Sequence, residues 1–295
     1  VLNQPDLADE IAIYRCDVLY HLGRVHSLMQ ETELAQAYAE ASIECSGENG
    51  LTSVLGYNLL GGISENLDNL DDAKSYYRLA LAKIIDDAEM DGANEREIRE
   101  SLAYTFYGTG LYEQAQQEYE AALKLRVQEH WPDHYEVAVA LINLATCEDQ
   151  LGLLNSAKQH YEEALRILQL QEDLEGMVMA DLYSKMGVVF WKNSAYAEAI
   201  RYYEQARTMY EQQAEPPLAA LAAVHTNMAN VYTSKKDYDQ ALHFHQQALR
   251  LNEQSNNAYG IAENYSNLGI VASKMEDWPL AKSYFERALE QRMDA

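Results

Sequence analysis

The sequence predicts an all-α fold, a solenoid of about seven antiparallel helix hairpins. Three observations support this prediction. One pattern of small and aromatic residues recurs along almost the whole chain of 295 residues. The chain holds only five prolines and 14 glycines, which favours helices because both residues disfavour helix interiors. Hydrophobic residues make up 48%, which is typical of a globular chain and too many for a disordered acidic one.

The recurring pattern begins with a small residue, followed by an alanine 12 positions later, an aromatic or similar residue four after that, and a second alanine three further on. The clearest copy reads Ala145, Ala157, Tyr161 and Ala164. We call the alanine 12 positions after the small residue the signature alanine. Successive signature alanines are 38 to 42 residues apart, which indicates one continuous array over residues 1–295. The signature alanines are Ala35, Ala73, Ala115, Ala157, Ala199, Ala241 and Ala281, and the repeats lie near 10–46, 52–88, 95–128, 134–170, 176–213, 216–254 and 258–292.

Each copy is expected to form two antiparallel helices, because apolar residues with helical spacing flank a short polar break such as 150–152 or 235–237. A small residue is needed where the two helices cross, since only then can the backbones approach closely. The aromatic residue is expected to fill the space toward the next hairpin. One hairpin cannot bury its own apolar stripe, so the hairpins are predicted to stack around a continuous core.

The pattern resembles the tetratricopeptide repeat over roughly residues 10–292. The common form of that repeat has about 34 residues, whereas the period of 42 here is similar to the kinesin light chain type. The string from Asp133 to Ala138, followed by Leu141 to Ala145, carries this second likeness. The resemblance implies a right-handed superhelical solenoid with a concave groove.

In such a solenoid, the first helix of each hairpin lines the groove, at positions 14 or 15, 11, 8 and 7 before the signature alanine. In the family that the chain resembles, asparagines at this place bind the backbone of an extended peptide, because an amide both donates and accepts hydrogen bonds. The alternative is that each asparagine bonds a neighbouring helix. The candidates are Asn143, Asn227, Asn230 and Asn267.

The same count places aromatic and basic residues in the groove, where they are candidate anchors for an acidic or aromatic peptide. The aromatic residues could equally pack against the next repeat, and the lysines could simply be solvated. These candidates are Tyr104, Tyr107, Trp191, Lys185, Lys192 and Lys274.

The net charge of −25 predicts repulsion from nucleic-acid phosphates and anionic lipid, so we expect neither nucleic acid nor membrane as a partner. Acidic runs such as 68–72 and 86–91 fit a solvated outer face as well as a binding patch. If they do bind, the protein or peptide partner carries basic residues and salt weakens the complex.

Three cysteines, Cys16, Cys45 and Cys147, cannot make a disulfide framework and indicate a reducing compartment. With no long apolar run and no signal peptide in the sequence, a cytoplasmic location is expected. The sequence does not begin with Met, and its last repeat is followed by no polar capping helix. This pattern predicts an apolar end that is covered by a further segment, by self-association or by a partner.

Catalytic and metal-binding patterns are weak, so we expect no enzyme activity, cofactor or metal. His130, Asp133 and His134 lie close together at a hairpin junction, but no further ligand is near. His245 occupies the aromatic position and is expected to be a core residue, and Cys147 is expected to be buried and inert. A clamp for a C-terminal carboxylate is rejected, because Thr226 stands where its lysine would be.

The leading functional hypothesis is a protein-interaction scaffold or adaptor that holds a peptide segment or partner helix in the groove. Two alternatives remain open from the sequence. The chain could be a peptide-responsive regulator, or the regulatory arm of a larger enzyme.

Overall fold

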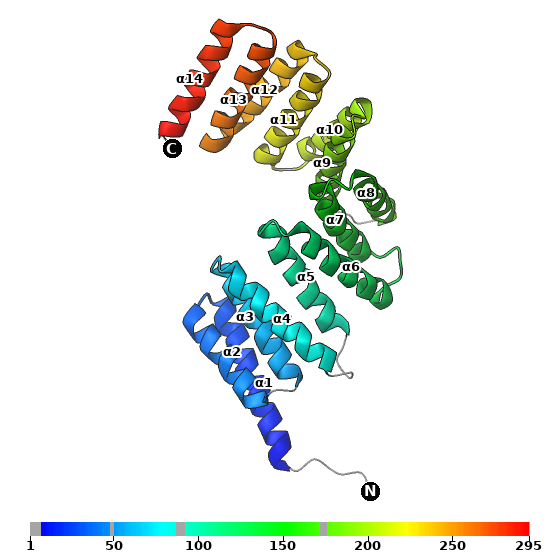
Figure 1. The fold of residues 1–295 in the computed structure, drawn as a ribbon, viewed down its shortest axis with the longest axis vertical. Coiled ribbons are helices and arrows are strands. Elements are labelled where there is room, and N and C mark those ends of the chain that lie inside the picture. The colour runs from blue at the N-terminus through cyan, green and yellow to red at the C-terminus, as the bar shows by residue number, and fades with distance from the viewer. Residues whose placement is uncertain (1–6, 48–49, 87–91, 172–175, 295) are drawn as a thin grey trace. The chain divides into compact units, whose positions relative to one another are not determined.

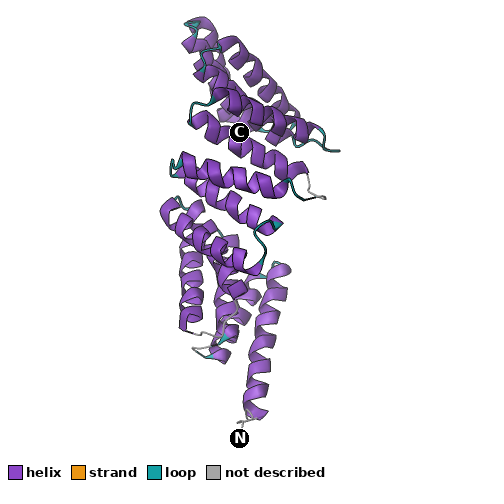
Figure 2. Cartoon of the chain, turned by 90° about the vertical axis from the view of Figure 1, so that its right-hand side faces the viewer, coloured by secondary structure: helices purple, strands orange, loops and turns teal. Residues whose placement is uncertain are grey.

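A computed structural model describes residues 7–47, 50–86, 92–171 and 176–294. Within these ranges the chain is made of helices joined by short loops, with no strand (Figures 1 and 2). The predicted all-α array of helix hairpins is confirmed. The chain divides into two compact units, 1–152 and 153–295, and each is described by itself. That the repeats form one continuous array stays a prediction.

The first unit holds three helix hairpins and one further helix. The hairpins pair α1 with α2, α3 with α4, and α5 with α6, and each second helix also packs against the first helix of the next hairpin. The helices are α1 (Leu7–Leu28), α2 (Thr32–Ser46), α3 (Leu51–Asn66), α4 (Leu70–Asp86), α5 (Gly92–Gly108), α6 (Tyr112–Glu129) and α7 (Tyr135–Gln150).

The second unit begins with one helix and continues with three hairpins. Here α9 pairs with α10, α11 with α12, and α13 with α14, while α8 packs against α9. The helices are α8 (Leu154–Leu168), α9 (Gly176–Lys192), α10 (Tyr196–Glu211), α11 (Leu218–Ser234), α12 (Tyr238–Gln254), α13 (Ala258–Lys274) and α14 (Trp278–Asp294).

The turn before each signature alanine has the same backbone conformation in all seven repeats. The residue five positions before the alanine has a positive φ, between 59° and 76°. This left-handed conformation costs little for glycine and more for other residues. The polar breaks predicted at 150–152 and 235–237 are therefore confirmed as turns. The residues at this position are Gln30, Asp68, Gly110, Gly152, Ser194, Lys236 and Glu276.

In the second and fifth repeats, the small residue lies where the two helices of the hairpin cross. A Cβ atom on Gly61 would lie 2.4 Å from the ring of Tyr77, and one on Gly187 would lie 2.5 Å from the ring of Tyr203. The aromatic residue thus packs against the small residue of its own hairpin, a contact that the repeat pattern did not predict. Tyr77 and Tyr203 are buried, while Phe285, at the same position in the last hairpin, is 43% exposed.

The cysteines of the first hairpin bear on the compartment of the protein. Cys16 and Cys45 form a disulfide between α1 and α2, with their Cα atoms 5.4 Å apart. The expectation drawn from the cysteine count is therefore wrong for this pair, because antiparallel packing brings residues 29 positions apart within bonding distance. None of the described helices has both the length and the apolar character of a membrane span. A cytoplasmic location stays a prediction, and it loses the support of the cysteines.

Candidate functional site

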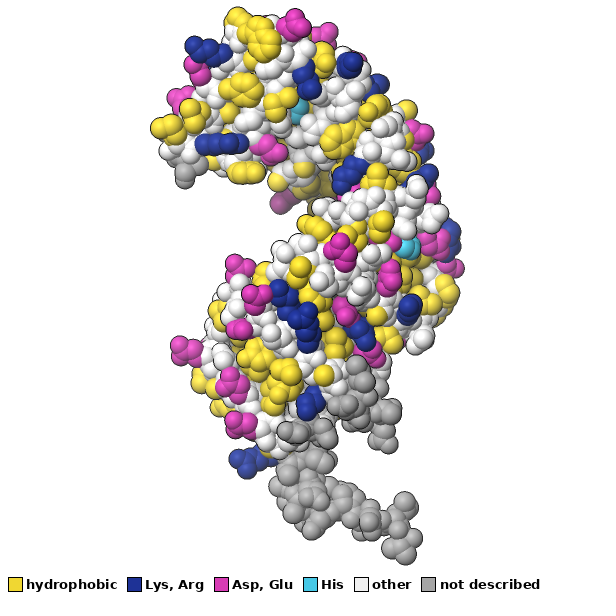
Figure 3. Space-filling model, in the orientation of Figure 1, with side chains coloured by type: hydrophobic (Ala, Val, Ile, Leu, Met, Phe, Trp, Pro, Cys, Tyr) yellow, Lys and Arg dark blue, Asp and Glu magenta, His cyan; other side chains and the backbone are white. Residues whose placement is uncertain are grey.

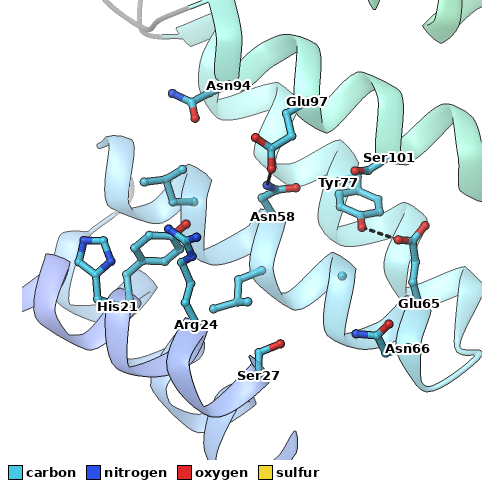
Figure 4. Close-up of a pocket in the computed structure, with 14 residues that line it drawn as sticks. His21, Arg24, Ser27, Asn58, Glu65, Asn66, Tyr77, Asn94, Glu97 and Ser101 are labelled. Carbon is cyan, nitrogen blue, oxygen red and sulfur yellow. Dashed lines mark hydrogen bonds between the residues drawn. The ribbon is translucent and has the colours of Figure 1, made fainter. Parts of the chain in front are cut away.

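A cavity of about 560 Å³ lies in the first unit, between the first helices of the first three hairpins (Figure 4). We call it the N-terminal cavity. Polar side chains line most of it, and its walls come from α1, α3 and α5, with one residue of α4. The lining residues are Tyr20, His21, Arg24 and Ser27; Leu55, Asn58, Leu59, Gly62, Glu65 and Asn66; Tyr77; and Asn94, Glu97 and Ser101.

The position of these residues follows the register that was expected to face a groove. All five groove positions of the second repeat, counted 15, 14, 11, 8 and 7 residues before Ala73, line the cavity. In the first repeat, counted from Ala35, four of the same five positions do so. The helical face predicted to bind a ligand is therefore the face that lines the cavity in these repeats.

Glu65 is held in place at one side of the cavity. Its carboxylate accepts a hydrogen bond from the Tyr77 hydroxyl at 2.9 Å and another from the Thr105 hydroxyl. Burial, together with the negative charge of Glu65, raises the pKa of Tyr77 well above its ordinary value. Tyr77 consequently stays protonated and keeps donating to the Glu65 carboxylate.

Opposite charges face the same space from α1 and α5. Arg24 points from α1 toward the cavity, with its guanidinium carbon 5.8 Å from the centre of the Tyr20 ring (Figure 4). Glu97 on α5 accepts a hydrogen bond from the Asn58 amide at 3.4 Å, near the outer limit for such a bond. A ligand could replace this weak bond at little cost, and both a cation and an anion are available to it.

Two further amides of the cavity have hydrogen-bonding capacity to spare. The side chains of Asn66 and Asn94 make no hydrogen bond to another described residue. Each amide can donate and accept at once, as a peptide unit requires. The cavity wall therefore carries three asparagine side chains, those of Asn58, Asn66 and Asn94.

A smaller cavity, of about 200 Å³, lies in the second unit between α11, α13 and the end of α12. Three alanines, Gly260 and the exposed Tyr259 make up much of its wall. Asn227, one of the predicted groove asparagines, lines it with Glu263.

Other asparagines next to this smaller cavity hold helices together. Asn264 is 1% exposed; it accepts a hydrogen bond from Asn252 at 2.7 Å and donates one to Thr226 at 3.0 Å. Asn257 in turn donates to Asn252 at 3.1 Å. This chain of bonds joins α11, α12 and α13, so these amides are structural.

The ten predicted groove residues are divided between the two units, and none of them lines the N-terminal cavity. In the first unit, Tyr104 is exposed and Tyr107 packs edge-on against Tyr112, with ring centres 5.3 Å apart. In the second, Trp191 donates to the hydroxyl of Ser234 at 3.0 Å, so it contacts the next hairpin. Asn143, Lys192 and Lys274 are exposed, and Lys185, Asn227, Asn230 and Asn267 are half-buried.

The predicted groove residues did not include the residues of the N-terminal cavity, although the same count reaches several of them. The predicted residues all come from the third to seventh repeats, although asparagines also stand at groove positions of the second. Applying the same count to Ala35 and Ala73 would have found Arg24, Asn58 and Asn66. The signal was therefore present in the first two repeats.

Other residues singled out in the sequence have structural roles. His245 is buried, as predicted, and burial lowers its pKa to about 4. Cys147 is also buried, donates to the carbonyl of Tyr112 at 3.0 Å, and has its pKa raised to about 11 by burial. His134 caps the start of α7 and stacks on His130.

Comparisons with known proteins decide the family. A family model described as the tetratricopeptide repeat matches residues 94–169, 178–254 and 220–294, and a second model of that description matches 56–82. The chain is a tetratricopeptide repeat protein. None of the curated proteins compared with the chain matches it.

Solved structures share the fold of these tetratricopeptide repeats at low sequence identity. RapI in its apo form is 14% identical, with a TM-score of 0.70 over 95% of this chain and 98% of its own. BtubC (BKLC) from P. vanneervenii is 22% identical, with a TM-score of 0.61 over 85% of this chain and 93% of its own. PilF of Pseudomonas aeruginosa is 18% identical, with a TM-score of 0.54 over 84% and 95%. Membership of this family supports a protein-interaction scaffold in general.

Proposed function

We propose that the chain is a non-catalytic interaction module that binds an extended peptide segment of a partner protein in the N-terminal cavity. One observation carries the proposal: groove positions of two successive repeats converge on a single polar cavity. Asn58, Asn66 and Asn94 are proposed to pair with the peptide backbone. Each such bond contributes on the order of 1 kcal/mol.

Charge determines which peptides fit best. Glu97 is exposed at the cavity, and the whole chain has a net charge of −25, so a peptide with a basic residue is favoured there. Arg24 is placed to donate hydrogen bonds to a carboxylate of the same peptide. On the face seen in Figure 3, acidic side chains are scattered and Lys and Arg side chains lie between them.

The test is selection of peptides from a random displayed library on the full chain, followed by affinity measurement on a synthetic copy of a selected peptide. A triple variant with Asn58→Ala, Asn66→Ala and Asn94→Ala is expected to bind about a hundredfold more weakly, as the loss of three bonds implies. The matched control replaces the exposed Asn155 and Asn193 with alanine and should keep the affinity of the unmodified chain.

A third variant separates the cavity from the asparagines that the sequence predicted. It carries Asn143→Ala, Asn227→Ala and Asn267→Ala. Loss of binding in this variant alone would move the site to those repeats and contradict the proposal. Failure to select any peptide would contradict it as well.

A further inference from the structure

The first helix of each hairpin carries a face that packs against the preceding hairpin. This face consists of the positions 17, 13 and 10 residues before the signature alanine, and all three are buried in each of the last six repeats. Contacts show what covers them. A Cβ atom on Gly56, at the first position, would lie 2.6 Å from Ile43 of α2, and Cys147, at the third, bonds the carbonyl of Tyr112.

In the first repeat the same face is exposed. Val18 is 57% exposed, Leu22 is 37% exposed and Val25 is 49% exposed. All three are apolar, and the register places them on one side of α1. We call this surface the leading face, and no described residue covers it.

The second helix carries the complementary face, at positions 4, 8 and 11 after the signature alanine. Positions 4 and 11 are buried in the second to sixth repeats, and position 8 is buried or half-buried there. Arg126, at position 11, pairs with Glu136 of the next hairpin at 3.1 Å, while Asn252, at the equivalent position, bonds Asn264. Position 8 is the one that Ile43 uses to touch Gly56.

This complementary face is exposed on α14. Phe285 is 43% exposed and Leu289 is 60% exposed, and Arg292 is exposed as well. Hydrophobic side chains are visible at the surface over α13 and α14 in Figure 3. We call this surface the trailing face.

We propose that two copies of the chain associate head to tail, with the trailing face of one docked on the leading face of the other. The two faces are the two halves of the contact that successive repeats form within the chain. A second copy supplies the missing half of each, with Leu289 set against Val18 of the partner copy as Ile43 is set against Gly56. The faces differ from each other, so the contact is heterologous and leaves one face open on each end of the pair.

The charge of the chain opposes this association. Two copies with a net charge of −25 repel each other, and salt screens that repulsion. Association is therefore expected to strengthen as salt rises from about 0.1 M to about 1 M, where the screening length falls from about 10 Å to about 3 Å. The inference concerns the stacking faces and is independent of peptide binding in the cavity.

Analytical ultracentrifugation of the full chain, up to about 1 mM protein, tests the proposal. Val18→Glu blocks the leading face and Leu289→Glu blocks the trailing face. Each variant alone should be monomeric, whereas their equimolar mixture should form a dimer and nothing larger. Leu79→Glu places the same charge at an exposed apolar position on neither face and should associate like the unmodified chain.

Several results would overturn the proposal. The unmodified chain could stay monomeric at every concentration and salt level, or either variant could dimerise by itself through two like faces. A mixture of the two variants that stays monomeric would also contradict a heterologous contact. Circular dichroism of each variant checks that it keeps its helices.

Discussion

Asn58 in the first unit and Asn264 in the second both lie on the first helix of a hairpin, yet their surroundings differ. Asn58 lies 15 residues before its signature alanine, is half-buried and lines the N-terminal cavity. Asn264 lies 17 residues before its own alanine, is 1% exposed, and bonds Asn252 and Thr226. A shift of two positions along an α-helix turns the direction of the side chain by about 200° around the helix axis. Register, rather than residue type, therefore decides whether an amide faces a ligand or a neighbouring helix.

The largest expected difference in stability lies at the aromatic position of the repeat. Tyr77 occupies this position in the first unit and His245 occupies it in the second. Burial lowers the pKa of His245 to about 4, below its unfolded value of about 6.5, so the folded state keeps it neutral. His225, also buried, has its pKa lowered to about 4 mainly by burial. As pH falls, both histidines are protonated in the unfolded chain before they are protonated in the folded protein. The free energy of unfolding therefore falls between about pH 6.5 and about pH 4, by at most roughly 3 kcal/mol for each histidine.

His245→Phe tests this effect, because phenylalanine occupies the same position in the last repeat. Urea unfolding at several pH values should show a shallower loss of stability below pH 6.5 in the variant than in the unmodified chain. The same slope in both proteins would show that His245 does not titrate as its burial implies.

The next contrast is between the two asparagines themselves. Asn264→Ala leaves Asn252 and Thr226 without their buried partner, so the free energy of unfolding should fall by about 2 to 3 kcal/mol. Asn58→Ala removes only a long bond to Glu97 and should change it by less than about 0.5 kcal/mol. Both are measured by urea unfolding at neutral pH, and equal effects would refute the assignment of roles by register.

The smallest expected effect lies in the turns, where the first unit has Gly110 and the second has Lys236 at the equivalent left-handed position. Gly110→Ala should lower the free energy of unfolding by about 1 kcal/mol, because alanine adopts this conformation with strain. Lys236→Gly should raise it by up to about 1 kcal/mol, since the gain is partly offset by the entropy of glycine in the unfolded chain. Thermal melting resolves both changes, and a loss of stability in Lys236→Gly would contradict the turn analysis.

Much of the fold could be predicted because the same residue pattern recurs in every repeat. The alanines at fixed spacing specify the crossing of two helices, and the turn before each alanine specifies where the chain reverses. The same spacing identifies the helical face that lines the N-terminal cavity, because Asn58 and Asn66 lie on it.

The location of the cavity was not predictable from residue type. Asparagine occurs at groove positions of several repeats, but a cavity forms only where the packing of neighbouring helices leaves space, as beside Gly62 between α1, α3 and α5. The bonds of Asn264 depend on Asn252 and Thr226 of the preceding repeat, which no single repeat reveals. The disulfide between Cys16 and Cys45 likewise follows from antiparallel packing rather than from the number of cysteines.

Hydrogen–deuterium exchange of the full chain, with and without a peptide selected on it, tests the central claim most directly. Binding in the N-terminal cavity predicts slower exchange in the segments 20–27, 55–66 and 94–101, which line it. Protection that instead falls on 219–227 and 257–263, around the smaller cavity of the second unit, would contradict the account.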